Sequence, residues 1–164
     1  MQTSDMLFLV DTNVWLDNYL GFRPGHAASC AFLDEAISRK ASLCHAATTA
    51  KDVHFFTCSF LKRAARERGE TVSEAQAKAI SAIAWGNLTN MNDLSTVVGV
   101  DASDYWLAEK LRTLNEDIED NLIMAAAERA GANYIVTRDK GLLKKATVSA
   151  LTPEDATALL RALG

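Results

Sequence analysis

Acidic side chains occur at four points of the sequence where they could act together in chemistry. Asp11 ends the apolar run Met6 to Val10, and Asp139 follows another short apolar run. Asp52 and Asp120 stand near the starts of two expected helices. Carboxylate oxygens with no thiolate or imidazole beside them select hard cations. The four aspartates therefore predict a site for Mg²⁺ or Mn²⁺.

Each of these aspartates also has an ordinary structural explanation. Asp11 could cap the helix that follows it, because aspartate is a good N-cap residue. Asp52 lies three residues after Thr49, which is the spacing of a capping box. Asp139 could stabilise a turn formed with the two residues after it. At each position taken alone, these explanations compete with metal binding.

The acids around Asp120 exceed what helix capping requires. Asp117, Glu119 and Asp120 fall within four residues at an expected helix start, where the helix dipole favours negative charge. These carboxylates repel one another unless a cation lies between them. The residues after Asp120 are mostly apolar, which places this carboxylate near the domain interior. We therefore expect Asp120 to bind a cation, with Asp117 and Glu119 in support.

Two uncharged residues are placed to support the aspartates. Asn13 follows Asp11 by two residues, and its amide can bond the backbone or a neighbouring carboxylate. Thr137 ends an expected strand and could bond a metal-ligating carboxylate or a bound water. The three histidines form no ligand motif, and the sequence has no phosphate-binding glycine motif and no serine nucleophile elbow.

The composition is that of an ordinary globular protein. The 164 residues suit one compact domain over residues 1–164, and 49% of them are hydrophobic. The net charge of −4 argues against broad, charge-driven binding to nucleic acid, although a local basic rim is compatible with it. The three cysteines match no zinc pattern. With no apolar stretch near membrane-spanning length, we expect a cytoplasmic protein with no membrane contact.

Short apolar stretches alternate with longer segments of helical periodicity. We expect strands at residues 6–10, 41–45, 94–100, 133–137 and, more weakly, 147–151. We expect helices at residues 14–20, 27–39, 50–68, 73–87, 101–114, 121–130 and 153–163. This alternation is typical of an α/β fold with a parallel sheet.

A parallel sheet gives the acidic residues a geometric test, because ligands bind beyond the carboxyl ends of its strands. Asp11 and Asp139 directly follow strands, and Asp52 opens the helix after the second strand. These three are readily placed at one edge of the sheet. Asp120 precedes its strand by a whole helix, so this rule does not by itself bring it to the same edge.

Three stretches of the sequence resemble the motifs of PIN-domain nucleases. Residues 9–17, Leu-Val-Asp-Thr-Asn-Val-Trp-Leu-Asp, are similar to the opening strand of that family. Residues 117–127 resemble its third acidic motif, and residues 133–140 resemble the motif that closes its active site. In order and spacing, the resemblance spans nearly the whole chain.

The resemblance implies a doubly wound, three-layer α/β/α sandwich with a sheet of four to five strands. It also implies cleavage of RNA with Mg²⁺ or Mn²⁺. By position, Asp11, Asp120 and Asp139 match the acidic metal-site residues of the family. Asp52 stands where the family usually has glutamate. Asn13 and Thr137 match the supporting polar positions.

Small PIN-domain proteins of this kind are often toxins of toxin–antitoxin pairs, similar to the VapC group. The resemblance therefore implies a homodimer and a small antitoxin that covers the site. Lys51, Arg138 and Lys140 are the candidates near the motifs for contact with RNA. Asp17, one turn past Asn13, could add an outer carboxylate, but we expect it at a solvated helix position.

The expected reaction is hydrolysis of a phosphodiester by a metal-activated water, without a covalent intermediate. The products would carry a 5′-phosphate and a 3′-hydroxyl. An alternative is a weakly active or inactive module that keeps the fold and binds RNA or protein. A phosphatase-like hydrolase with Asp11 as nucleophile would need a second aspartate two residues on, where this chain has Asn13.

Overall fold

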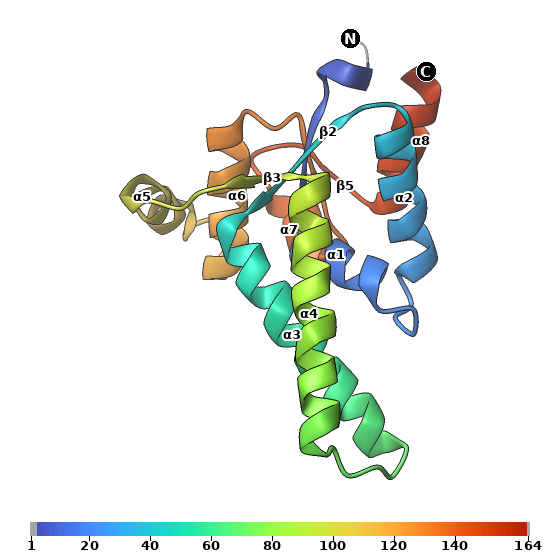
Figure 1. The fold of residues 1–164 in the computed structure, drawn as a ribbon. Coiled ribbons are helices and arrows are strands. Elements are labelled where there is room, and N and C mark those ends of the chain that lie inside the picture. The colour runs from blue at the N-terminus through green and yellow to red at the C-terminus, as the bar shows by residue number, and fades with distance from the viewer. Residues whose placement is uncertain (1–2, 164) are drawn as a thin grey trace.

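The computed structural model describes residues 3–163 and contains a five-stranded, entirely parallel sheet. The strand order is β3-β2-β1-β4-β5, so the chain winds outward from a central first strand in both directions (Figure 1). This order confirms the doubly wound sheet. The strands are β1 (Leu7–Val10), β2 (Ser42–Ala46), β3 (Thr96–Val98), β4 (Tyr134–Val136) and β5 (Ala150–Leu151).

Helices cover both faces of the sheet, which confirms the three-layer sandwich (Figure 1). The helices α2 and α8 lie together on one face, while α5 and α6 lie on the other. A short 3-10 turn, Thr3–Asp5, precedes the sheet. The helices are α1 (Thr12–Tyr19), α2 (His26–Ser38), α3 (Ala47–Glu67), α4 (Glu74–Leu94), α5 (Ala102–Leu111), α6 (Ile118–Ala130), α7 (Lys140–Lys145) and α8 (Pro153–Leu163).

The central strand β1 divides the core into two clusters. Phe8 and Val10 pack into the cluster that includes Trp15 of α1 and Phe32 of α2. Leu9, which points to the opposite face, packs into the cluster built around α6. All three strand residues are fully buried, so a continuous apolar run is what this position requires. The strand thereby delivers Asp11 to a fixed point at the sheet edge.

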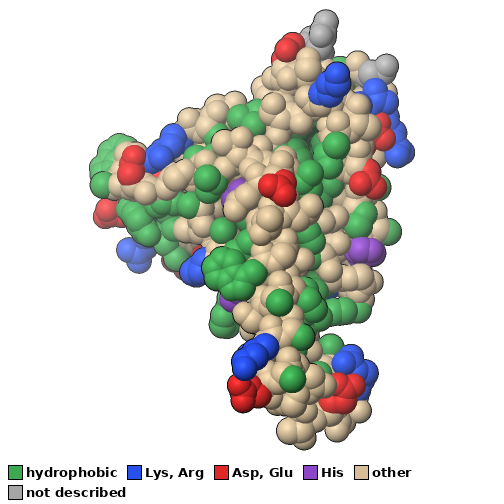
Figure 2. Space-filling model, viewed as in Figure 1, with side chains coloured by type: hydrophobic (Ala, Val, Ile, Leu, Met, Phe, Trp, Pro, Cys, Tyr) green, Lys and Arg blue, Asp and Glu red, His purple; other side chains and the backbone are tan. Residues whose placement is uncertain are grey.

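Helices α3 and α4 pack along one another and extend well beyond the sheet as an arm (Figure 1). Figure 2 shows side chains of both charges at the far end of this arm. Ion pairs join Arg63 to Glu67 and Arg68 to Glu70 there. No helix within residues 3–163 has the length and apolar character needed to cross a membrane.

Several element boundaries differ from the prediction. Helix α4 continues to Leu94, seven residues past the expected end, because Met91 is fully buried against the core. This packing outweighs the poor helix propensity of the asparagines nearby. Helix α7 was not predicted at all, and strand β3 is shorter than expected. Helix α3 starts three residues earlier than expected, with consequences for Asp52.

Candidate functional site

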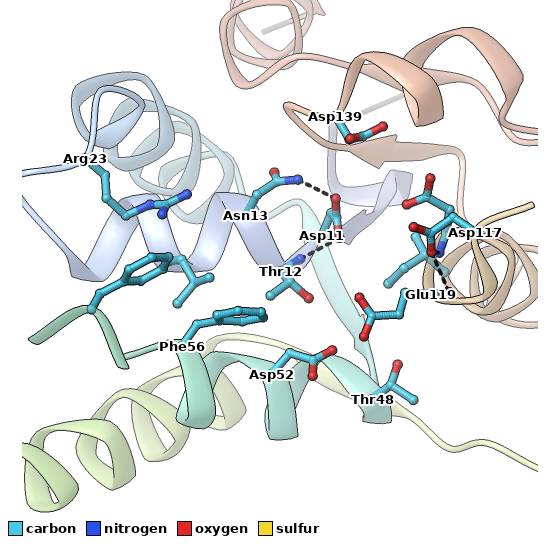
Figure 3. A pocket seen from close by; sticks show the side chains of 14 residues that line it. Asp11, Thr12, Asn13, Arg23, Thr48, Asp52, Phe56, Asp117, Glu119 and Asp139 are labelled. Carbon is cyan, nitrogen blue, oxygen red and sulfur yellow. Dashed lines mark hydrogen bonds between the residues drawn. The ribbon is translucent and has the colours of Figure 1, made fainter. Parts of the chain in front are cut away.

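A pocket at the carboxyl edge of the sheet brings the four predicted aspartates together (Figure 3). They come from four separate segments, and each lies at the end of a strand or in the first turns of a helix. Asn13, Asp117 and Glu119 also line this pocket. We call it the carboxylate pocket.

Asp11 is the most constrained of these side chains. It is 7% exposed, directly follows β1, and is the N-cap of α1. Its Oδ1 accepts a hydrogen bond of 2.7 Å from the backbone N–H of Thr12. Its Oδ2 accepts bonds of 2.7 Å from the Nδ2 of Asn13 and the Oγ1 of Thr137. Asp11 therefore caps α1 and also faces the pocket, with three donors fixing its carboxylate.

Asn13 and Thr137 hold the two motif segments in register. The Nδ2 of Asn13 donates to Asp11, and its Oδ1 accepts a 3.0 Å bond from the backbone N–H of Arg138. The Oγ1 of Thr137, which is fully buried, accepts a 3.0 Å bond from the backbone N–H of Asp139. These bonds tie the start of α1 to the segment after β4. The expected bonds from both side chains to a neighbouring carboxylate are present.

The start of α6 divides its acids between capping and the pocket. The Oδ1 of Asp117 accepts from the backbone N–H groups of Glu119, at 2.8 Å, and Asp120, at 3.3 Å, and so caps the helix. Asp120 is thereby released from capping. Its Oδ2 accepts a 2.7 Å bond from the Nδ2 of Asn115, and its side chain lines the pocket.

The convergence of Asp120 has a topological cause that the sequence argument missed. Helix α6 leads into β4, and the chain must return across the sheet before a parallel strand can start. The N-terminus of such a helix therefore lies at the carboxyl edge of the strands. This rule would have placed Asp120 beside Asp11 and Asp139 from sequence alone.

The structure overturns the capping-box explanation of Asp52. Helix α3 begins at Ala47 and has Ala46 as its N-cap, so Thr49 lies inside the helix. The Oγ1 of Thr49 is instead 3.4 Å from that of Thr12. Asp52 is 8% exposed and lines the pocket opposite α1, with an ion pair of 2.8 Å to Lys51. Its position needs an explanation other than capping.

Asp139 keeps a capping role, although in a helix rather than an isolated turn. It is the N-cap of α7, and its Oδ1 accepts a 2.8 Å bond from the backbone N–H of Leu142. Its other oxygen remains available to the pocket, which the side chain lines (Figure 3). The glycine at its second position and its length of 6 residues hide this helix from a propensity-based prediction.

Burial, together with neighbouring charges, raises the pKa of three carboxyl groups in the pocket, those of Asp11, Glu119 and Asp120. Burial, with the charges of Asp120 and Asp139 added, raises the pKa of Asp11 to about 6 even though Thr137 and Thr12 donate to it. The pKa of Asp120 is raised mainly by burial. Burial, followed by the charge of Asp52, raises that of Glu119. A cation in the pocket would relieve this repulsion.

Comparison with known proteins identifies the family. The family model of the PIN domain matches residues 8–141, which include every residue that lines the carboxylate pocket. The chain belongs to the PIN domain family. PIN domains are generally nucleases.

Two solved structures share the fold of this PIN domain. One is VapBC2 from Rickettsia felis bound to a DNA fragment from their promoter, with a TM-score of 0.62 and 12% identity. That match covers 90% of this chain and 98% of the other. The second is PAE2754 from Pyrobaculum aerophilum, with a TM-score of 0.59, 19% identity and 98% of each chain covered. No protein of curated function matches the sequence.

PIN domains typically use divalent metal ions, and the donor chemistry of this pocket fits such an ion. The lining supplies carboxylate and amide oxygens, which are the ligands of hard cations. The pKa values of Asp11, Glu119 and Asp120, raised by burial and by neighbouring carboxylates, are in keeping with this chemistry. In the conformation described for residues 3–163, however, no three acidic, histidine or cysteine side chains converge closely enough to hold a metal. Binding would require the other carboxylates to move toward Asp11, whose own orientation three hydrogen bonds fix.

The three expected RNA contacts of the PIN domain lie outside the pocket lining. Lys51 is exposed and paired with Asp52, while Lys140 is exposed on the first turn of α7. The guanidinium of Arg138 lies between Glu154, at 3.2 Å, and Asp17. Lys51 is therefore held by one carboxylate and Arg138 by two, whereas Lys140 has no ion pair among the described residues.

Asp17 does not occupy the solvated position expected for it. It is 2% exposed, and it accepts from the Nε of Arg23 at 2.5 Å and pairs with the Nε of Arg138 at 3.3 Å. The backbone of Gly25 packs against this ion cluster so closely that a Cβ there would lie 1.9 Å from the Oδ2 of Asp17. The expectation failed because the cations that neutralise Asp17 come from a loop and a distant strand end.

Arg23 is the residue of this pocket that sequence reasoning missed. Among the described residues, it is the only cationic side chain in the pocket lining, across the pocket from Asp117 and Glu119 (Figure 3). Asp17 fixes its Nε, and its guanidinium carbon lies 5.0 Å from the ring centroid of Phe60. Its place in a loop between two glycines gave no periodic signal.

Proposed function

We propose that this PIN domain is a metal-dependent endoribonuclease that hydrolyses RNA phosphodiester bonds with Mg²⁺ or Mn²⁺. The observation that carries the proposal is the carboxylate pocket itself, in which Asp11, Asp52, Asp120 and Asp139 converge from four segments. Membership of a family of nucleases supports it. The raised pKa of Asp11, about 6, further supports a pocket suited to a cation.

The roles of the residues follow from their contacts. Asp11, Asp120 and Asp139 would hold the cation, and Asp52 would bind it from α3, directly or through water. A bound divalent cation lowers the pKa of a coordinated water and neutralises charge that develops on the phosphate. The three hydrogen bonds on Asp11 keep its carboxylate in one orientation. Asn13 and Thr137 are therefore positioning residues.

We further propose that the chain is the toxin of a type II toxin–antitoxin pair and acts in the cytoplasm. The support is the fold shared with a structure of VapBC2 over nearly the whole of both chains. An antitoxin would cover the carboxylate pocket. A homodimer would form through α5 and the start of α6, where Tyr105, Trp106 and Ile118 expose 52–60% of their surfaces. Burying such aromatic side chains is a common source of interface stability.

Incubation of the purified protein with a panel of RNAs tests the nuclease proposal. We expect cleavage with Mg²⁺ or Mn²⁺, no cleavage with a chelator, and products that carry 5′-phosphates. Asp11→Ala and Asp120→Ala should each lower the rate by about 1,000-fold or more, because the cation and its electrostatic stabilisation would be lost. Circular dichroism of both variants serves as the folding control.

One observation favours the alternative of a module that binds RNA or protein without cleaving it. The carboxylates of residues 3–163 do not converge into a ready ligand set. Binding of RNA that is equal with Mn²⁺ and with chelator, and without cleavage of any RNA in the panel, would establish this alternative. A calorimetric titration with Mn²⁺ alone separates the two, since only the nuclease needs the carboxylates to bind the ion.

A further inference from the structure

A second cavity adjoins the carboxylate pocket and shares part of its lining. It lies between the loop after α1 and the arm. The residues that line it include Phe22, Arg23, Phe60, Arg63 and Arg68. Arg23 and Phe60 line both cavities. The two cavities therefore adjoin at these two side chains. We call this second hollow the arm groove.

One face of α3 forms the floor of both cavities. Asp52 and Phe56 line the carboxylate pocket, Phe60 lines both, and Arg63 and Glu67 line the arm groove. These positions recur at intervals of three and four residues, which places them in one stripe along the helix. At a rise of 1.5 Å per residue, the stripe runs about 16 Å from Asp52 to Arg63. That length exceeds one nucleotide and fits an extended strand.

The charge of the lining changes sign along this stripe. The carboxylate pocket is acidic, whereas the arm groove carries Arg23, Arg63 and Arg68 against Glu67. The Nε atoms of Arg63 and Arg68 form exposed ion pairs with Glu67 and Glu70, respectively. Such pairs contribute little free energy, so a phosphate can displace or join them. Three arginines thus lie beside the acidic site although the net charge of the chain is −4.

Arg23 is pre-organised to bind a phosphate at the junction, the place where the carboxylate pocket and the arm groove meet. Its Nε is bonded to the buried Asp17, and among residues 3–163 no hydrogen bond engages either Nη atom. The guanidinium stacks near Phe60, whose ring in turn stacks on Phe56 with centroids 5.9 Å apart. The terminal amino groups therefore have a fixed direction and no partner, which suits a bidentate contact with phosphate oxygens.

Phe22 supplies an exposed aromatic surface on the opposite wall. It is 59% exposed, and it lies in the loop between α1 and α2. Aromatic faces next to arginines are the usual means of binding unpaired bases without sequence preference. An apolar peptide would also fit against Phe22 and Phe60, but it would supply no acceptor for the Nη atoms of Arg23, which no described residue engages.

We propose that the arm groove is a subsite for single-stranded RNA next to the cleaved bond. Arg23 binds the phosphate at the junction, Phe22 stacks a base, and Arg63 with Arg68 binds the following phosphate. This inference rests on the proposed nuclease function, which sets the direction in which the RNA strand enters the carboxylate pocket. It assigns the arm a role in substrate length and affinity, which the nuclease proposal leaves open.

Two pairs of matched variants test the subsite. Phe22→Ser is compared with Phe55→Ser, since Phe55 is 60% exposed on the arm but lines neither cavity. Arg63→Gln is compared with Arg66→Gln, since Arg66 is exposed on the same helix but lines neither cavity. The substrates are a labelled single-stranded RNA of about 12 nucleotides, long enough for a strand-binding groove, and a dinucleotide.

We expect Phe22→Ser and Arg63→Gln each to raise KM for the longer RNA about tenfold, with kcat changed by less than about twofold. Neither control should change KM, and cleavage of the dinucleotide should be equal in all five proteins. Equal KM values for the paired variants would overturn the subsite and leave the nuclease proposal intact. Loss of binding to a co-expressed antitoxin in Phe22→Ser, with RNA kinetics unchanged, would also overturn it in favour of a protein-binding groove.

A binding measurement separates failure of the subsite from failure of the nuclease proposal. Fluorescence anisotropy of the longer RNA is followed in an Asp120→Asn background, which removes one pocket charge and blocks cleavage. If the wild-type protein cleaves no RNA, the nuclease proposal fails. An about tenfold loss of affinity in Phe22→Ser but not Phe55→Ser would then still uphold the RNA subsite, and equal affinities would overturn it.

Discussion

Helix α3 begins in the carboxylate pocket and ends at the tip of the arm, and its two ends treat charge differently. At the pocket end, Asp52 is 8% exposed and faces Glu119, whose pKa its charge helps to raise. At the arm end, Arg63 and Glu67 are largely exposed and pair across one helical turn at 2.8 Å. The same helix thus carries a buried charge that repels a neighbouring carboxyl group and exposed charges that pair with each other.

The difference shows which parts of the molecule can store functional strain. The pocket is built on the fully buried residues 8–10 of β1 and on the fully buried Thr137, which short hydrogen bonds tie to Asp11 and to the backbone of Asp139. Such a frame can hold repelling carboxylates in place without a cation. The arm has no comparable frame, and its charges are free to rearrange around a ligand.

The pH dependence of stability without metal should separate the two regions most strongly. Because the pKa of Asp11 is raised from 3.8 to about 6, its protonated form stabilises the fold. That contribution is complete below about pH 4 and is lost as the pH rises through about 6. It amounts to on the order of 3 kcal/mol. Urea unfolding in chelator should show the difference in stability between wild type and Asp11→Asn shifting by this amount between about pH 4 and pH 8.

Asp93→Asn, an exposed aspartate on α4, is the control for that experiment and should give a curve parallel to that of the wild type. Parallel curves for Asp11→Asn would mean that Asp11 ionises normally. The contrast between the pocket and the arm would then lose its main support.

Removing the hydroxyl of Thr137 should have the next largest effect. Thr137→Val keeps the shape of this buried side chain but deletes its bond to Asp11 and its acceptor for the N–H of Asp139. We expect Mn²⁺ affinity to fall about 10–100-fold, as for other partners that orient a metal ligand. Isothermal titration calorimetry measures this, and Thr137→Ser should restore most of the affinity. Wild-type affinity in Thr137→Val would contradict a positioning role.

The role of Asp52 can now be tested without the ambiguity of a helix cap. Asp52→Asn should weaken Mn²⁺ binding several-fold, by about 3- to 10-fold, since it removes one charge but no hydrogen bond to the helix start. The free energy of unfolding in chelator should change by less than about 0.5 kcal/mol. A larger loss of stability with unchanged metal affinity would assign Asp52 a structural role after all.

The smallest effect is expected at the arm. The pair of Arg63 and Glu67 spans four residues on an exposed helix face. A double-mutant cycle with Arg63→Gln and Glu67→Gln should give a coupling free energy below about 0.5 kcal/mol by thermal unfolding. A value well above this would show that the arm, like the pocket, holds its charges in a fixed frame.

The sequence predicted the sheet and most of the site because both depend on local patterns. Asp11 and Asp139 follow apolar runs that can only be buried strands, and a parallel sheet brings such positions to one edge. Asn13 and Thr137 could be interpreted from their distance to those aspartates. The acid group at residues 117–120 was predicted, although the rule that carries it to the same edge was not applied.

The parts that could not be predicted depend on contacts between distant segments. Asp17 looked solvated because its partners Arg23 and Arg138 come from elsewhere in the chain. Helix α4 runs past its expected end because Met91 finds a place in the core. The start of α3 was misplaced because the helix begins at Ala46 and Ala47 without a side-chain cap. In each case tertiary packing overrides a local signal.

The carboxylate pocket and the arm groove share one face of α3. Their alignment therefore depends on how the residues of that face are rotated about the helix axis. One residue inserted between Asp52 and Phe60 would turn everything beyond it by about 100° around the helix axis. Arg63 would then swing off the groove while Asp52 stayed in place. An insertion of seven residues, close to two full turns, would return the stripe to nearly its original direction and lengthen the spacing by about 10 Å. Changes of length in this helix are therefore tolerable only in steps that preserve its phase.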